Sequence, residues 1–414
     1  MVDLKPQNIL VIGFVWPEPN SSAAGGRMMQ LIDCFLAQNS KITFACAAAD
    51  SAFMLDVKDI GIEKVSIELN NSSFDDFIRN LQPTLVLFDR FMVEEQFGWR
   101  VAKECPDALR ILDTEDLHCL RAARQIALKE KREFTPFDLL SDIAKREIAS
   151  ILRCDLSLII SLYEMELLTK IIKIDPALLL YLPFLLDPIL TEISNQWPSF
   201  SERKHFVFIG NFLHEPNWDA VKFLKEEVWP LIRKELPEAE LHIYGAYPSQ
   251  KVLQLNAIHE GFHCLGRAEN ASEVVSKARV CLAPVRFGAG IKGKLVEAMQ
   301  CGTPSVTTSI GAESMHGDLA WNGFVKNSPE DIAEAAVQLY MDPLVWQQSQ
   351  KNGITIVEKI YSKSFYRKKL IDQIFHIQAT LKDHRLQNFT GAMLMHHTLA
   401  STRYMSKWIE EKNK

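Results

Sequence analysis

The chain has 414 residues with 46 basic and 52 acidic side chains, so its formal net charge is −6, and 47% of its residues are apolar. These values are typical of a globular protein and exclude a disordered chain, a collagen-like repeat and a coiled coil. The mild negative charge argues against a nucleic-acid binder, which is usually basic. The length predicts two or three domains.

The charge is divided unevenly along the chain. Residues 1–190 hold 20 basic and 28 acidic side chains, a balance of −8, whereas residues 191–414 hold 26 and 24, a balance of +2. If the chain binds an anionic ligand, the second half is therefore the better place to look for its site.

Cysteine usage and the N-terminus bear on the compartment. None of the eight cysteines forms a Cys-x-x-Cys pair, and most have apolar neighbours, which predicts reduced, buried thiols rather than disulfides or a zinc cage. The N-terminal residues run directly into a short strand-like segment and show no signal peptide. We therefore expect a cytoplasmic protein, and peripheral contact with the inner face of a membrane stays open.

The first half of the chain alternates strand-like and helix-like segments. An apolar strand is expected at 8–15, followed by a Pro/Gly/Ser loop and a helix over 27–37. Such alternation predicts a mostly parallel sheet with helices on both faces. The remaining strands are expected at 41–46, 63–68, 84–89, 108–113 and 156–161, and helices at 93–104 and 117–131.

A Pro- and Ser-rich stretch over 182–203 breaks this alternation, and we place the domain boundary there. The alternation then restarts, which predicts two doubly wound, Rossmann-like α/β domains over 1–190 and 191–380 that face each other across a cleft. In the second half, strands are expected at 205–209, 241–244, 280–285 and 305–308, and helices at 219–234, 294–301, 330–340 and in the C-terminal region.

Segment 278–308 carries the strongest functional signal. Its strand runs into a glycine-rich loop with Gly288 and Gly290, and that loop opens a helix. Free N–H groups at a helix start suit a phosphate, and Lys292 and Lys294 add positive charge. Glu297 follows Lys294 by one turn, where a carboxylate accepts hydrogen bonds from a ribose diol. A packing loop with two solvated lysines is the alternative, but the combination favours a nucleotide-diphosphate site.

This segment resembles the donor-binding signature of family 4 glycosyltransferases of the GT-B fold. The signature reads here as a strand ending in Pro284, GAG at 288–290, KLVEAM at 294–299 and CGTPSVTT at 301–308. Segment 206–245 is similar to the opening of that family's donor domain. The resemblance covers 205–310 strongly, whereas in the first half it rests on the architecture and on a Gly-Gly loop.

The resemblance implies a nucleoside-diphosphate sugar as co-substrate, a glycan, lipid-linked or protein hydroxyl as acceptor, and a role in polysaccharide biosynthesis. Transfer would proceed with retention at the anomeric carbon, with no cofactor and no essential metal. Lys292 and Lys294 would stabilise the departing diphosphate, and Glu297 would hold the ribose. The expected donor contacts are Gly25, Gly26, Arg27, Asn211, Gly288, Gly290, Ile291 and Glu297.

Two positions depart from the family pattern. The family usually has a second glutamate eight positions before the helix glutamate, and this chain has Ala289 there. An Arg and Lys pair often follows the first donor-domain strand, where this chain has Asn211 to Asn217. These departures place the neutralisation of the diphosphate more heavily on Lys292 and Lys294.

The first half contributes two loops at strand ends. Gly25 and Gly26 at a helix N-terminus could approach the donor phosphates from across the cleft, with an ordinary glycine-containing βα turn as the alternative. Arg27 either meets an anion or caps the surface. In the loop after strand 108–113, the resemblance places His118 near the reacting sugar, with Asp116 and Arg121 on the acceptor side. The alternative is that residue 114 or 116 caps a helix with His118 in its first turn. A lone acidic pair here is weak support for a metal.

Two further motifs receive a plain interpretation. His259 and His263 match HExxH, but Gly261 interrupts the helix that a zinc protease needs, so we expect no metal site there. The basic run over 121–132 suits an anionic acceptor or lipid headgroups, although interleaved glutamates favour a solvated helix face. We expect segment 381–414 to pack back on the first domain, with a partner-binding helix as the alternative.

We therefore expect a GT-B glycosyltransferase with an acceptor domain followed by a nucleotide-sugar domain. A sugar-nucleotide epimerase and a non-catalytic, transferase-like binding subunit stay open as alternatives. The sequence leaves open the base, the sugar, the acceptor and the oligomeric state.

Overall fold

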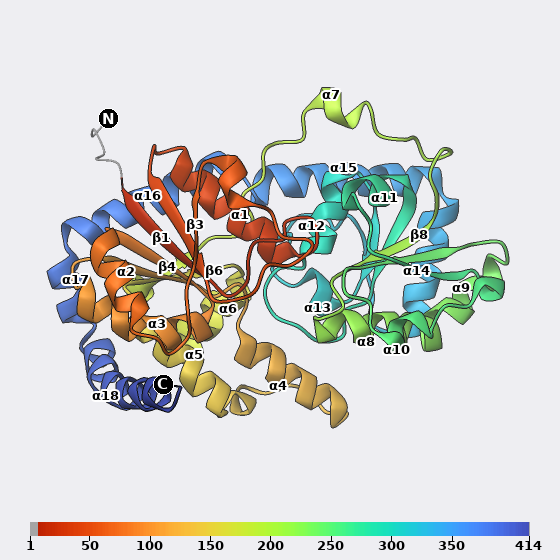
Figure 1. The fold of residues 1–414 in the computed structure, drawn as a ribbon. Coiled ribbons are helices and arrows are strands. Elements are labelled where there is room, and N and C mark those ends of the chain that lie inside the picture. Colours follow the sequence, from red (N-terminus) through yellow and green to blue (C-terminus); the bar gives the residue numbers. More distant parts are fainter. Residues whose placement is uncertain (1–6, 414) are drawn as a thin grey trace.

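The protein folds into two α/β domains that lie side by side (Figure 1). The computed structural model describes residues 7–413, with side chains throughout except at 397–400. Each domain is built on one sheet of parallel strands flanked by helices, so the predicted pair of doubly wound domains is confirmed.

The N-terminal domain holds a seven-stranded parallel sheet in the order β3-β2-β1-β4-β5-β6-β7. The central strands are buried apolar runs, as expected where helices cover both faces of a sheet. Its strands are β1 (Asn8–Gly13), β2 (Lys41–Cys46), β3 (Glu63–Ser66), β4 (Leu85–Asp89), β5 (Leu109–Asp113), β6 (Leu156–Ile159) and β7 (Leu179–Tyr181). Its helices are α1 (Ala23–Leu36), α2 (Ser73–Leu81), α3 (Phe91–Glu104), α4 (His118–Lys129), α5 (Asp142–Arg153) and α6 (Leu162–Glu166).

The C-terminal domain holds a six-stranded parallel sheet in the order β10-β9-β8-β11-β12-β13. Connections diverge between β8 and β11, which is where open parallel sheets bind ligands. Its strands are β8 (Lys204–Ile209), β9 (Leu241–Tyr244), β10 (Phe262–Gly266), β11 (Ala278–Ala283), β12 (Ser305–Thr307) and β13 (Gly323–Val325). Its helices are α7 (Thr191–Ser194), α8 (Glu215–Phe223), α9 (Trp229–Glu235), α10 (Gln250–Leu253), α11 (Ala271–Lys277), α12 (Gly293–Gln300), α13 (Ser309–Ala312), α14 (Pro329–Met341) and α15 (Pro343–Ile360).

The chain returns to the N-terminal domain earlier than the predicted boundary at 380. Helix α16 (Lys363–Ala379) packs Leu370 and Ile374 into one apolar cluster with Ile9 and Val11 of β1. Figure 1 shows α16 and the following α17 (Leu381–Gln387) running along the N-terminal domain. The return therefore lies between α15 and α16, because the apolar side chains of α16 are buried against the first sheet.

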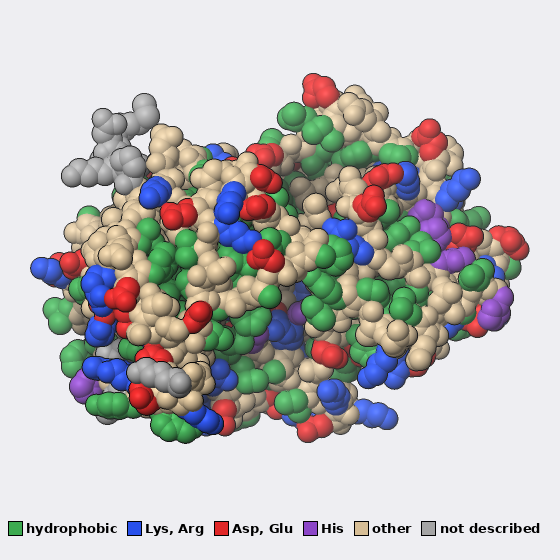
Figure 2. Space-filling view, viewed as in Figure 1, with side chains coloured by type: hydrophobic (Ala, Val, Ile, Leu, Met, Phe, Trp, Pro, Cys, Tyr) green, Lys and Arg blue, Asp and Glu red, His purple; other side chains and the backbone are tan. Residues whose placement is uncertain are grey.

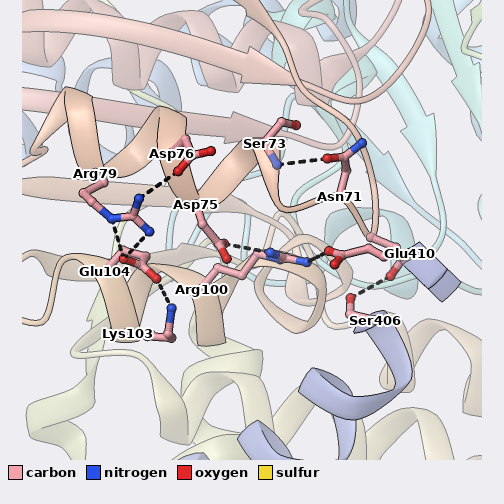
Figure 3. Close-up of polar contacts among 11 residues, drawn as sticks. Asn71, Ser73, Asp75, Asp76, Arg79, Arg100, Lys103, Glu104, Ser406 and Glu410 are labelled. Carbon is pink, nitrogen blue, oxygen red and sulfur yellow. Dashed lines mark hydrogen bonds and ion pairs between the residues drawn. The ribbon is translucent and has the colours of Figure 1, made fainter. Parts of the chain in front are cut away.

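The last helix, α18 (Phe389–Lys412), lies on the outer side of the N-terminal domain against α3 and α5 (Figure 1). Arg100 of α3 is buried between two carboxylates, with 2.7 Å from its guanidinium to Asp75 and 2.7 Å to Glu410 of α18 (Figure 3). Ser406 donates a 3.0 Å hydrogen bond to the Asn70 side chain. These polar contacts hold α18 against the first domain.

Among the described residues, none of the helices combines the length and the apolar character needed to cross a bilayer.

Candidate functional site

The two domains enclose a cleft of about 790 Å³ between the carboxyl edges of their sheets. Loops after β1, β4 and β5 line one side, and loops after β8, β9, β10 and β11 line the other. Figure 2 shows the hollow between the two lobes, with basic and histidine side chains visible inside it. The site therefore lies at the ligand-binding edge of both sheets.

Helix α12 points its N-terminus into the cleft, where Lys292 and Lys294 bring two positive charges together. Lys292 donates a 2.8 Å hydrogen bond to the Gly290 carbonyl. Lys294 donates to the Asn217 carboxamide oxygen and lies 4.4 Å from the centre of the Phe208 ring. Gly210 leaves room for this arrangement, because a Cβ there would stand 2.8 Å from Asn217.

Burial makes the charged forms of both lysines costly. It lowers the pKa of Lys292 to about 8 and the pKa of Lys294 to about 7. A bound diphosphate would add negative charge beside both ammonium groups, raise their pKa values and favour their charged forms. The two lysines thus form an electropositive pocket that favours an anion.

Glu297 lies one turn further along α12 and also lines the cleft. Burial raises the pKa of its carboxyl group, and the Ser272 hydroxyl lies 3.5 Å from one carboxylate oxygen. Among the described residues, Glu297 forms no ion pair with a basic side chain, so its oxygens can accept hydrogen bonds from ligand hydroxyls.

The N-terminus of α1 faces that of α12 across the cleft. The two helices approach so closely that a Cβ on Gly293 would stand 2.4 Å from the Ala23 Cβ. Gly26 lines the cleft, whereas Gly25 packs against the backbone of Glu18 and does not. The structure thus brings two helix N-termini to one cavity, and their N–H groups suit the same anion.

Arg27 does not reach the cleft. Its side chain is fully buried and pairs with Asp113 at 2.9 Å, and it donates to the carbonyls of Leu182 and Pro183. The expected donor contact by Arg27 is therefore not what the geometry supports: this arginine joins α1, β5 and the chain after β7 inside the N-terminal domain.

Several hydrogen bonds join the two domains around the cleft. The Asn211 carboxamide donates to the Ser21 carbonyl at 3.3 Å. Arg124 of α4 donates to the Gly288 carbonyl at 2.9 Å and pairs with Glu313 at 2.7 Å. These contacts hold the glycine-rich loop against the first domain.

Gly290 and Ile291 are buried in this interface. The Gly290 N–H donates to Glu164 at 2.9 Å, and a Cβ at Gly290 would stand 2.9 Å from the Asp116 Cβ. Gly290 also has a φ of +61°, so glycine is required there both by conformation and by space. Ile291 lines the cleft, whereas Gly290 itself does not.

The acceptor-side residues lie where β5 ends, and their charges are largely paired with one another. Asp116 pairs with Arg121, and His118 lies 3.6 Å from Asp116 and 3.3 Å from Glu147. All three predicted residues line the cleft. Burial alone would raise the pKa of Asp116, but Arg121 and His118 hold it below its usual range.

Carboxylates from two other helices, and not residue 114 or 116, accept the free N–H groups at the start of α4. Glu147 of α5 accepts from the N–H groups of His118 and Cys119, both at 2.9 Å, and Glu164 accepts from that of Leu117. His118 therefore sits in the first turn of α4 while its ring still lines the cleft.

Arg90, Glu115 and Arg267 also line the cleft, although the sequence analysis gave none of them a donor or acceptor role and weighed Glu115 only as part of an acidic pair. Arg90 and Glu115 follow β4 and β5 with φ values of +74° and +62°, a strained backbone for non-glycine residues. Burial raises the pKa of Glu115 well above its usual range. Only their position after a strand could have pointed to them.

Both departures from the family pattern lie in the cleft. Ala289 is buried and lines the cavity, so the wall is apolar where the family usually has a carboxylate. His214, in the loop after β8, also lines the cleft, and burial together with Arg121 lowers its pKa to about 3. Neither position adds positive charge at neutral pH, which leaves Lys292 and Lys294 as the main cations near α12.

The HExxH match lies outside the cleft, and its two histidines are not on one helix. His259 is 82% exposed on a 3-10 turn, whereas His263 lies on β10. The basic run over 121–132 is likewise split, because Arg121 and Arg124 point into the domain interface and form ion pairs there.

Comparisons with known proteins agree with this geometry. Residues 203–342 match the family model "Glycosyl transferases group 1". A search of curated proteins gives no match. Sucrose-phosphate synthase from Thermosynechococcus elongatus is similar in structure, with a TM-score of 0.65, 14% identity, and 90% of this chain and 99% of that chain covered.

Two further structures are similar. Anabaena HepE, in complex with UDP and glucose, has a TM-score of 0.64 and 12% identity, with 89% of this chain and 99% of that chain covered. S. aureus TarM has a TM-score of 0.57 and 13% identity, covers 72% of this chain, and is matched over 57% of its own length. The predicted GT-B fold is confirmed, and the match over residues 203–342 supports the predicted glycosyltransferase class. Assignment to family 4 stays a prediction.

Proposed function

We propose that the protein transfers a sugar from a nucleoside-diphosphate sugar to a hydroxyl acceptor, with retention at the anomeric carbon and without an essential metal ion. The observation that supports this most is the pair of buried lysines at the N-terminus of α12, with Glu297 one turn further. Retention and metal independence are carried over from the resemblance.

In this proposal each part of the cleft has one task. Lys292 and Lys294 bind the diphosphate and stabilise the charge that grows as the bond from the anomeric carbon to the phosphate oxygen breaks. Glu297 accepts hydrogen bonds from the ribose hydroxyls. The acceptor oxygen bonds to the anomeric carbon from the same face, and its proton passes to the departing phosphate.

The N-terminal wall would hold the acceptor. His118 lies beside the Asp116–Arg121 pair, and this set offers both donors and acceptors for a hydroxyl-rich molecule. The uncharged Ala289 places no carboxylate on the donor sugar, so we propose that sugar recognition depends more on the N-terminal wall than in relatives with the second glutamate.

A donor screen tests the proposal. UDP and UDP-glucose are the first compounds to try, because HepE structures contain them. A true donor should raise the melting temperature, and above its Kd the rise should grow with the logarithm of the donor concentration. Nucleotide release that depends on an added acceptor would support transfer, and the absence of stabilisation by any nucleoside diphosphate would contradict the site.

The same screen separates the two alternatives. Formation of an epimeric sugar from donor alone would identify an epimerase. Binding of a nucleotide sugar without labelling of any glycan, lipid or protein pool would identify a non-catalytic subunit.

We also propose weak peripheral membrane contact through the loop between α4 and α5. Phe137 and Leu140 are 81% and 80% exposed there, close in sequence to Lys129 and Lys131. Sedimentation with anionic vesicles that drops in the double variant Phe137→Ser, Leu140→Ser would support this contact. Equal sedimentation of both proteins would contradict it.

A further inference from the structure

Histidines gather at the amino ends of three neighbouring strands in the C-terminal sheet. His242 of β9 stands in register with His263 of β10, and His205, the second residue of β8, stacks on His242. Figure 1 places this end of the sheet at the outer edge of the domain, and Figure 2 shows histidine and acidic side chains together on that edge. The same strands run into the cleft at their other ends, so this cluster is separate from the donor site.

Glu240 brings a carboxylate to these imidazoles. One of its oxygens lies 2.9 Å from His242 Nε2 and the other lies 4.0 Å from His263 Nε2. One ligand atom from each of the three residues lies within 4.8 Å of the other two. The His205 ring stacks on His242 with 3.9 Å between centroids and holds that ring in place.

One nitrogen of this cluster makes no hydrogen bond to the described residues. His263 Nε2 is buried and has no hydrogen-bond partner among them. Two imidazoles and a carboxylate are a common ligand set for Zn²⁺, with ligand distances of about 2.0–2.2 Å. Tetrahedral coordination at such distances puts ligand atoms roughly 3.3 Å apart. The three atoms lie within 4.8 Å of one another, so side-chain rotations of Glu240, which is 52% exposed, and of the imidazoles would bring them into coordination distance.

We propose that Glu240, His242 and His263 bind a divalent transition-metal ion of the Zn²⁺ class, with water in the open position. The ion would tie β9 to β10 at the end of the sheet that is remote from the cleft. It would therefore stabilise the C-terminal domain and take no part in sugar transfer. The metal-binding partners of His263 are thus Glu240 and His242 of the neighbouring strand segment, and not His259 of the HExxH match.

Calorimetric titration of the full, chelator-treated chain with ZnCl₂ tests this site. We expect one ion per chain, and a melting temperature about 4 °C or more higher at saturating Zn²⁺. Glu240→Gln and His263→Asn should each weaken Zn²⁺ binding by about tenfold or more. His259→Ala is the matched control, because this exposed histidine belongs to HExxH but not to the cluster.

The proposal would be overturned by no saturable binding in the wild type, by unchanged affinity in both cluster variants, or by a loss in His259→Ala equal to theirs. Glu240→Gln replaces a half-exposed side chain by one of the same shape, so its fold is expected to persist; its melting temperature without metal checks this. Cobalt absorption with a thiolate charge-transfer band would assign binding to cysteine and also contradict the site. Each readout is independent of donor turnover.

Discussion

The two walls of the cleft use charge in different ways. On the donor wall, Lys292, Lys294 and Glu297 come from one short segment. Burial lowers the pKa of both lysines and raises that of Glu297, so the charged form of each is disfavoured in the empty cleft. On the acceptor wall, Asp116 and Arg121 neutralise each other. Unsatisfied charge on the first wall suits a charged ligand, whereas paired charge on the second suits a neutral, hydroxyl-bearing one.

Arg27→Met tests whether charge on the N-terminal side serves the fold. The substitution leaves Asp113 buried without its partner, and breaking such a pair costs about 3–5 kcal/mol. We expect a large fall in the free energy of unfolding, measured by chemical denaturation, with an unchanged Michaelis constant for the donor in protein that still folds. A raised Michaelis constant for the donor with an unchanged free energy of unfolding would instead mean that Arg27 contacts the donor.

Lys294→Ala tests the opposite role on the donor wall. Loss of a positive charge that opposes the departing diphosphate should lower kcat/KM by about 10²–10³-fold. Lys294 donates to Asn217 of α8 and its ammonium group lies over the Phe208 ring of β8. Because burial already disfavours its charged form, we expect the melting temperature to change less than turnover does. Lys277→Ala, at an exposed lysine paired with Glu273, is the control and should leave turnover intact.

Glu297→Gln should have a smaller effect, confined to donor binding. Hydrogen bonds to a charged group contribute about 1.5–3 kcal/mol, so we expect the donor Michaelis constant to rise by roughly 10–100-fold with a smaller change in kcat. Steady-state kinetics at saturating acceptor would measure this split. A fall in kcat alone would mean that Glu297 acts in the chemical step.

The pH profile of donor affinity should be the mildest test. The pKa values of about 7 for Lys294 and about 8 for Lys292 belong to the empty cleft, and an anion raises them. Binding then takes up protons, so affinity should fall as pH rises from 7 to 9, by at most tenfold per unit for each lysine. Lys294→Arg, which stays charged, should flatten the profile; an affinity that increases with pH would contradict this assignment.

The same contrast explains what the sequence could predict. The donor wall was predictable because its strand, glycine loop and charged residues are consecutive, and only their local structure had to be inferred. Arg90 and Glu115 were not, since their positive φ values follow from how β4 and β5 end in the assembled sheet. The destination of α16 was also hidden, because periodicity identifies a helix but not the sheet that it covers. Strands β7 and β13 have three residues each, too few to show a pattern.

Titration calorimetry with a panel of nucleoside diphosphates tests the central claim most directly, in the wild type and in Lys294→Ala and His118→Ala. We predict that at least one nucleotide binds the wild type, that Lys294→Ala weakens it by about tenfold or more, and that His118→Ala binds it as the wild type does while losing sugar transfer. Failure of every nucleotide to bind, or equal binding to the wild type and Lys294→Ala, would contradict the donor site on α12.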